Sequence, residues 1–233
     1  MKKFFWIFLL ILSVSSSLFL TSCKDDDDDD DDDVIKAKVM VVHASPGAPD
    51  VDILVDDTKV NTAPLAYPNN TAYLDVTAGV RNVKVNVAGL TPVVNVLDFS
   101  TPTLVAGSSY SVFAGNTVAD IEPIVFTDNL SAPEQGKAHV RFIHLSPDAP
   151  AVDIALVGGA VVFPNFSFKE ASTFTPLNAG TYNLEVRVAG TATVALTLPP
   201  VTFVSGKIYT VFAKGLLAGT GDQALGAQVI ANN

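Results

Sequence analysis

The chain has 233 residues, of which 48% are hydrophobic, and a formal net charge of −10 at pH 7. Nine of its 24 acidic residues form the run Asp25–Asp33, so the remainder from Val34 onward carries 11 basic and 15 acidic residues and is only mildly acidic. This charge excludes a basic footprint for nucleic acid, and the single cysteine, Cys23, excludes an intrachain disulfide and a metal site built on several thiolates.

The first 22 residues are predicted to be a lipoprotein signal peptide. Two lysines in Met1–Lys3 precede the 17-residue apolar segment Phe4–Leu20, which is interrupted by serines and is shorter than the about 20 apolar residues of a transmembrane helix. The sequence Leu-Thr-Ser-Cys that ends at Cys23 resembles the lipobox, in which the cysteine receives a diacylglycerol before cleavage. We therefore expect acyl chains on Cys23 to hold the mature chain in the membrane.

Residues 23–33 are predicted to combine this anchor with a disordered acidic spacer. Nine consecutive aspartates repel one another and offer no apolar surface, so they favour neither helix nor strand. At about 3.3 Å per residue they would reach roughly 30 Å. Lys24 followed by Asp25 and Asp26 also resembles a surface-export tag of some Gram-negative bacteria, which implies an outer-membrane protein that faces the cell exterior.

The rest of the chain consists of two copies of one repeated unit. The segment His43–Ile53 returns as His144–Ile154 at a spacing of 101, with eight of eleven residues identical. The Ala-Gly pair at Ala78 returns at the same spacing, and Gly107–Phe113 returns two residues earlier as Gly206–Phe212. Three matches in the same order indicate a tandem duplication.

Each copy, about 100 residues long, is predicted to fold as a β-sandwich. Apolar and polar residues alternate along Val83–Val87 and Tyr182–Val188, which indicates strands with one buried and one wet face. Further strands of the first copy are expected at Val39–His43, Val51–Val55, Tyr73–Val76, Val93–Phe99, Tyr110–Ala114 and Ile121–Phe126. The predicted fold class is all-β, with sandwich domains at 34–131 and 137–233 and a short linker that limits their relative motion.

The repeated motif His-x-Ser-Pro-x-Ala-Pro-x-Val-Asp-Ile resembles domain-of-unknown-function family 4397. The resemblance covers both copies, essentially all of Val34 to Asn233. It implies an exported bacterial protein, often a lipoprotein, with tandem immunoglobulin-like β-sandwiches. It supplies no established reaction, and nothing in the sequence calls for a cofactor.

The motif is predicted to form the crossover between two strands, because its prolines fix φ and remove backbone donors. The residues concerned are His43, Ser45 and Asp52 in the first copy and His144, Ser146 and Asp153 in the second. In the preferred interpretation the histidine bonds to the serine, the aspartate or a loop carbonyl and pins a structural corner. The alternative is a histidine–aspartate pair that faces a ligand.

The sequence predicts neither an enzyme nor a metal site. A calcium loop at Asp50–Asp52 and Asp56–Asp57 is disfavoured, because the second copy keeps only Asp153 at the corresponding places. No Gly-x-Ser-x-Gly or His-Glu-x-x-His motif occurs, and Ser205–Ile208 has Ile where a phosphate loop needs Ser or Thr. With three histidines in all, a His-rich metal centre within one copy is excluded.

Three functions are considered, of which a lipid-anchored surface binding or adhesion module is preferred. Its ligand would be a glycan or a protein, and aromatic residues near loops, most of them expected in the core, would stack on sugars. These residues are Tyr67, Tyr73, Phe163, Phe166, Phe168 and Phe174. The second function is a structural envelope or fimbria-associated component. Fimbrial maturation by cleavage after an arginine is disfavoured, because the first arginine, Arg81, lies deep within the first domain. The third is a surface hydrolase with two carboxylates in one cleft.

Overall fold

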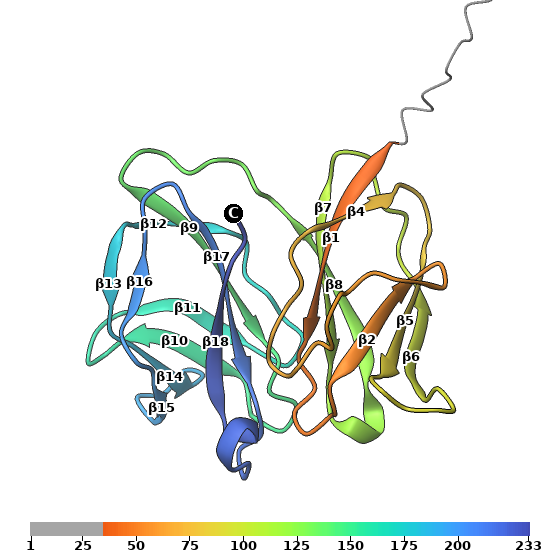
Figure 1. Cartoon of the computed structure of the whole chain (residues 1–233). Helices are drawn as coiled ribbons and strands as arrows, with labels where there is room; N and C mark the ends of the chain where they lie inside the picture. Colours follow the sequence, from red (N-terminus) through yellow and green to blue (C-terminus); the bar gives the residue numbers. More distant parts are fainter. Residues whose placement is uncertain (1–34) are drawn as a thin grey trace, which may run out of the picture. The chain divides into compact units, whose positions relative to one another are not determined.

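Strands provide almost all of the regular structure in residues 35–233, the part of the chain that the computed structural model describes (Figure 1). The predicted signal peptide, the predicted lipidation site Cys23 and the predicted export signal Lys24, Asp25 and Asp26 lie outside these residues. Two 3₁₀ helices of one turn, η1 (Val118–Asp120) and η2 (Gly221–Gln223), connect strands. Between residues 35 and 233 no helix has the length and apolar character to cross a bilayer. The all-β prediction is confirmed.

The first half folds as two packed four-stranded sheets. Its strands are β1 (Lys36–His43), β2 (Val51–Val55), β3 (Thr58–Lys59), β4 (Leu74–Thr77), β5 (Asn82–Val87), β6 (Asn95–Ser100), β7 (Ser109–Gly115) and β8 (Glu122–Asp128). The sheet orders are β4-β1-β7-β8 and β3-β2-β5-β6. β1 runs parallel to β7, and the other neighbours run antiparallel. Alternate residues of both sheets, among them Val39, Val41, Ile53 and Val85, meet in the first core.

The second half repeats this arrangement and has an additional two-stranded sheet. Its strands are β9 (Lys137–His144), β10 (Val152–Leu156), β11 (Val161–Phe166), β12 (Thr175–Asn178), β13 (Gly180–Tyr182), β14 (Leu184–Val188), β15 (Val194–Thr197), β16 (Val201–Phe203), β17 (Ile208–Lys214) and β18 (Gly226–Ala231). The sheet β12-β9-β17-β18, with β9 parallel to β17, and the sheet β11-β10-β14-β15 enclose a second core around Phe142 and Ile154. The prediction of two β-sandwiches is confirmed, and the immunoglobulin-like topology stays a prediction.

Some strands depart from the expected bounds. β2 spans the predicted Val51–Val55, but the predicted strand Tyr182–Val188 is broken at Asn183. The break arises because Tyr182 pairs with β16 whereas Leu184 pairs with β10. The short β3, which was not expected, follows a tight hairpin turn at Asp56 and Asp57, whose φ values are 47° and 63°. Two successive residues with positive φ match the twist of a two-residue hairpin.

A third apolar core lies between the two halves. The outer faces of the sheets that contain β1 and β9 pack together there, and the rings of Phe113 and Phe212 meet edge to face at 5.7 Å between centroids. Its buried members are Met40, Val42, Ala44, Phe113, Ile124, Ile143, Leu145, Phe212 and Ile230. β1 and β9 thus differ from the strands predicted to have one buried and one wet face, because both are buried on both faces from Val39 and Val140 onward. We call this contact between the two outer faces the seam.

Candidate functional site

Both histidines of the repeated motif are buried in the corner between strand and crossover. His43 is 2% exposed and His144 is 0% exposed. The Nε2 atom of His43 lies 3.0 Å from the carbonyl oxygen of Pro49, and that of His144 lies 3.0 Å from the carbonyl oxygen of Pro150. Because a carbonyl only accepts, each Nε2 carries a proton. Burial lowers the pKa of both imidazoles, so both rings are neutral at pH 7. In the second copy Nδ1 of His144 accepts the Ser146 backbone N–H at 3.3 Å, so neither nitrogen of that ring is free for a metal or a proton transfer. Nδ1 of His43 is buried and has no hydrogen-bond partner among residues 35–233.

The motif aspartates bond to other groups. Asp153 is 5% exposed, and its carboxylate accepts the backbone N–H of Asn165 at 2.6 Å and of Gly190 at 2.9 Å. It thereby ties β11 and the turn after β14 to β10. Asp52 instead forms an ion pair of 2.7 Å with the exposed Lys59. In residues 35–233, neither aspartate forms a hydrogen bond with a motif histidine.

The motif serines are also fully buried. The hydroxyl of Ser146 donates to the carbonyl of Gly215 at 2.7 Å and joins the crossover to the end of β17. The hydroxyl of Ser45 has no hydrogen-bond partner in the part of the chain that the structure describes. In both corners the histidine bonds to a loop carbonyl, and among the described residues it does not bond to the motif aspartate.

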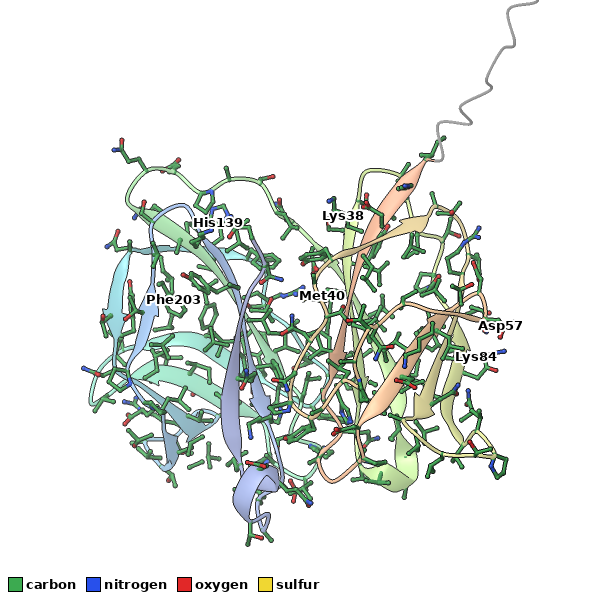
Figure 2. The ribbon with its side chains drawn as sticks, viewed as in Figure 1. Lys38, Met40, Asp57, Lys84, His139 and Phe203 are labelled. Carbon is green, nitrogen blue, oxygen red and sulfur yellow. The ribbon has the colours of Figure 1, made fainter. Side chains whose placement is uncertain are left out.

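The acidic loop of the first copy does not gather its carboxylates around one point. Oδ2 of Asp56 lies 3.1 Å from Nη1 of Arg81, and Asp57 pairs with Lys84 on the side of the sandwich away from the seam (Figure 2). Asp56 also accepts the Asn82 backbone N–H, which lowers the pKa of its carboxyl. Asp56 and Asp57 thus each have their own partner, and residues 35–233 contain no group of three or more His, Cys, Asp or Glu placed to hold a metal ion.

A buried polar network borders the third core at the seam. Nη1 of Arg141 lies 2.7 Å from Oδ1 of Asp128, and these side chains are 3% and 0% exposed. Oδ2 of Asp128 accepts the hydroxyl of Tyr73 at 2.6 Å and that of Ser111. Burial raises the pKa of Tyr73 above its ordinary value, so its phenol stays protonated and donates. The amide of Asn232 donates to the Tyr73 oxygen at 3.0 Å, and Nη2 of Arg141 donates to the Ser111 hydroxyl at 3.4 Å. Together with the Arg141–Asp128 ion pair, these bonds join the two halves at three contacts.

The guanidinium of Arg141 is also held by residues of both halves. Its Nη2 donates to the hydroxyl of Thr210 at 3.0 Å. Its central carbon lies 4.5 Å from the ring centroid of Phe174 and 5.6 Å from that of Phe126. Stacking of this kind contributes about 0.5–2 kcal/mol, with the higher value at desolvated sites. The charge of Arg141 is thus both paired and stacked.

A pocket of about 280 Å³ opens beside this network, and we call it the seam pocket. Its lining comes from both halves and consists of Phe126, Thr127, Asn129, Arg141, Ser172, Thr173 and Phe174. Asn129 accepts through its side-chain oxygen and Thr173 through its backbone carbonyl. The Asn129 amide nitrogen and the Thr173 hydroxyl have no protein partner among residues 35–233. The pocket is close to the lower limit of about 300 Å³ for small-molecule sites, and it combines ring faces with free hydrogen-bonding groups.

A second, more open pocket of about 220 Å³ lies at the crossovers, lined by Gly47, Ala48, Asp50, Tyr67, Asp222 and Gln223. It brings together Asp50 of the first half and Asp222 of the second, which the sequence does not predict. Lys214 lies beside them, with Nζ 5.3 Å from the Tyr67 ring centroid and bonded to the Asp222 carbonyl. Paired-carboxylate hydrolysis requires one acid in an apolar environment, whereas this pocket is open and polar.

The aromatic residues expected near loops are divided among several environments. Only Phe174 lines the seam pocket. Phe163 is 5% exposed in the second core, and Phe166 packs against that core. Tyr73 belongs to the buried network, and Tyr67 contacts the His43 ring edge to face at 5.8 Å. Of the six residues, Phe174 lines the seam pocket and Tyr67 lines the second pocket.

Arg141 and Asp128 were not predicted from the sequence as functional residues. A signal for Arg141 exists, because this arginine interrupts the apolar run from Val140 to Ile143 where the first copy has Met40. A charged residue at a position whose neighbours are all buried is seldom left without a partner. No comparable signal marks Asp128, since it ends a strand with polar neighbours.

Comparisons with known proteins identify the repeated unit without an activity. A family model described as a domain of unknown function, DUF4397, matches residues 37–155 and again residues 155–233. The two matches meet at Ala155 inside β10, not in the segment 129–136 that connects the sandwiches. No curated protein matches the chain.

Proposed function

Because the chain belongs to the DUF4397 family, whose function is unknown, we propose a function from its own residues. The protein is a lipid-anchored binding module of the bacterial surface that takes a neutral carbohydrate in the seam pocket. The observation that carries the proposal is the combination of two ring faces, Phe126 and Phe174, with the unengaged polar groups of Asn129 and Thr173 in one pocket.

The chemistry of the pocket suits a sugar. A pyranose has an apolar face of C–H groups that stacks on an aromatic ring and an edge of hydroxyls that donate and accept hydrogen bonds. The cation of Arg141 is balanced by Asp128 at 2.7 Å, so the pocket attracts neither an anion nor a cation strongly. Its volume of about 280 Å³ suits one sugar residue of a longer glycan.

The seam also makes the pocket rigid before a ligand arrives. Its two walls belong to different halves, and the third core with Phe113 and Phe212 fixes those halves against each other. A preformed site loses less conformational entropy on binding than a flexible one. The short connection 129–136 adds to this restriction.

The location rests on the N-terminal sequence. The apolar Phe4–Leu20, the lipobox-like residues before Cys23 and the aspartate run after Lys24 support a lipid anchor with a solvated spacer. The spacer would hold the sandwiches off the outer membrane on the external face. Radiolabelled palmitate should enter the full-length protein and not a Cys23→Ala variant, and protease added to intact cells should remove the sandwiches. Sandwiches that resist protease until the cells are lysed would contradict the external location.

Binding is tested with soluble residues 34–233 on an array of neutral and acidic glycans. We expect retention of a neutral glycan, and at least a tenfold weaker affinity for Phe174→Ala and Thr173→Val by titration calorimetry. Phe168→Ala and Thr103→Ala, which change residues outside the pocket lining, serve as matched controls. An array without any signal would contradict the proposal, and so would a bound glycan whose affinity the pocket variants leave unchanged.

A further inference from the structure

The apolar part of the seam is built from the same positions in both copies. The spacing of 101 relates Val42 to Ile143 and Ala44 to Leu145, and the spacing of 99 relates Phe113 to Phe212. All six side chains are 0% exposed. The seam therefore has the form of an isologous interface, in which one surface meets its own equivalent.

The apolar part of this face does not by itself distinguish a like half from an unlike half. Val42, Phe113 and their equivalents are all apolar, so these residues would accept a first half against a first half as readily as a first half against a second. The choice of partner must come from positions where the copies differ.

The copies differ in the buried network. Met40 of the first half corresponds to Arg141 of the second, and Ser111 corresponds to Thr210. Asp128 corresponds to Asn232, because Asp128 pairs with Ser109 and Asn232 bonds to Ile208, which occupy equivalent positions. Figure 2 places Met40 on the side of β1 that faces the second half.

Only the pairing of unlike halves balances the buried charge. In the observed seam Arg141 meets Asp128 at 2.7 Å. Two first halves in the same geometry would bury two Asp128 carboxylates opposite Met40, without a cation. Two second halves would bury two Arg141 guanidiniums opposite Asn232, without an anion. An unpaired buried charge is strongly unfavourable, whereas a pair with additional hydrogen bonds is tolerated.

We propose that the Arg141–Asp128 pair makes the outer face of each half selective for the unlike half. The occupant of the first half's face is therefore the second half of the same chain or, when two chains exchange halves, the second half of the other chain. The seam thus prevents the tandem copies from assembling through contacts between like halves.

The test uses the chain as it folds, with a protease site inserted between Ser131 and Ala132 in the connection and cut after purification. Cut protein is mixed with a ¹⁵N-labelled cut sample, and the pairs are counted by native mass spectrometry. We expect labelled and unlabelled halves to exchange only into first–second pairs. Like pairs in comparable amount would overturn the proposal. This measurement needs no substitution in the network.

Substitutions then assign the selectivity to the charge pair. Arg141→Met or Asp128→Asn alone should weaken the association of cut halves at least 100-fold. The double variant makes the two halves alike at both positions, so association should recover and like pairs should appear. Lys169→Met removes the exposed pair with Glu122, which also bridges the halves at 2.7 Å, and should leave selectivity unchanged. A double variant that still forms only unlike pairs would contradict the assignment.

Discussion

The motif aspartates allow the structural interpretation to be tested within one protein. Asp153 and Asp52 occupy the same motif position, but Asp153 is buried and accepts two backbone N–H groups, whereas Asp52 pairs with the exposed Lys59. Hydrogen bonds to a charged group contribute about 1.5–3 kcal/mol each. Because Asn165 and Gly190 are exposed enough for water to replace part of the loss, we expect Asp153→Ala to lower the free energy of unfolding by about 3 kcal/mol. An exposed ion pair contributes about 0–1 kcal/mol, so Asp52→Ala should have little effect.

The assay is urea denaturation of residues 34–233 followed by circular dichroism in the far ultraviolet. With a slope near 2 kcal/mol per molar urea, Asp153→Ala should shift the midpoint by roughly 1.5 M and Asp52→Ala by less than about 0.5 M. The slopes should not change, since both variants expose the same surface on unfolding. Equal midpoints for the two variants would refute the reasoning. So would an Asp153→Ala protein of unchanged stability that had lost its ligand, because the motif would then serve binding.

Two further predictions concern the buried corners and the third core. Burial lowers the pKa of His43 and His144 in the folded chain, so below about pH 6.5 the unfolded chain binds more protons than the folded chain. The free energy of unfolding should therefore fall as the pH drops, by at most about 1.4 kcal/mol per pH unit for each histidine. Urea midpoints at pH 7.5 and 5.5 should differ less in His144→Gln than in the wild type, and an equal difference would be contrary evidence. Phe212→Ala should lower the free energy of unfolding by about 3–5 kcal/mol in the same assay, whereas Phe168→Ala should lower it by less than about 1 kcal/mol. Comparable losses in the two variants would show that the seam contributes little to stability.

Features encoded within one strand or turn could be predicted from the sequence. The mostly apolar segment Val51–Val55, which follows the prolines of the crossover, placed β2 at its observed bounds, because these signals are local. The duplication likewise predicted a second sandwich. In contrast, the break at Asn183 depends on two different partner strands, which alternation along one strand does not reveal.

The seam could have been recognised in part. The unbroken apolar run Val39–Val42 is typical of a strand buried on both faces, whereas the alternation at Val83–Val87 is typical of one wet face. That contrast already distinguishes β1 from β5. The seam pocket had no such signal, because its lining joins Phe126 and Asn129 to Phe174 from the other half, and their proximity depends on how two folded units pack.

The position of β1 bears on how the fold resists mechanical force. A pull transmitted along the backbone into Lys36 enters a strand that lies between β4 and β7 and is paired with β7 in parallel over six positions, from Lys38 to His43. Tension along this strand loads these hydrogen bonds in shear, so they must fail together rather than open one after another. Extraction of β1 would also tear residues such as Val41 and Val42 out of two cores at once. The sandwiches would therefore withstand traction from a tether better than a fold whose first strand lay at a sheet edge.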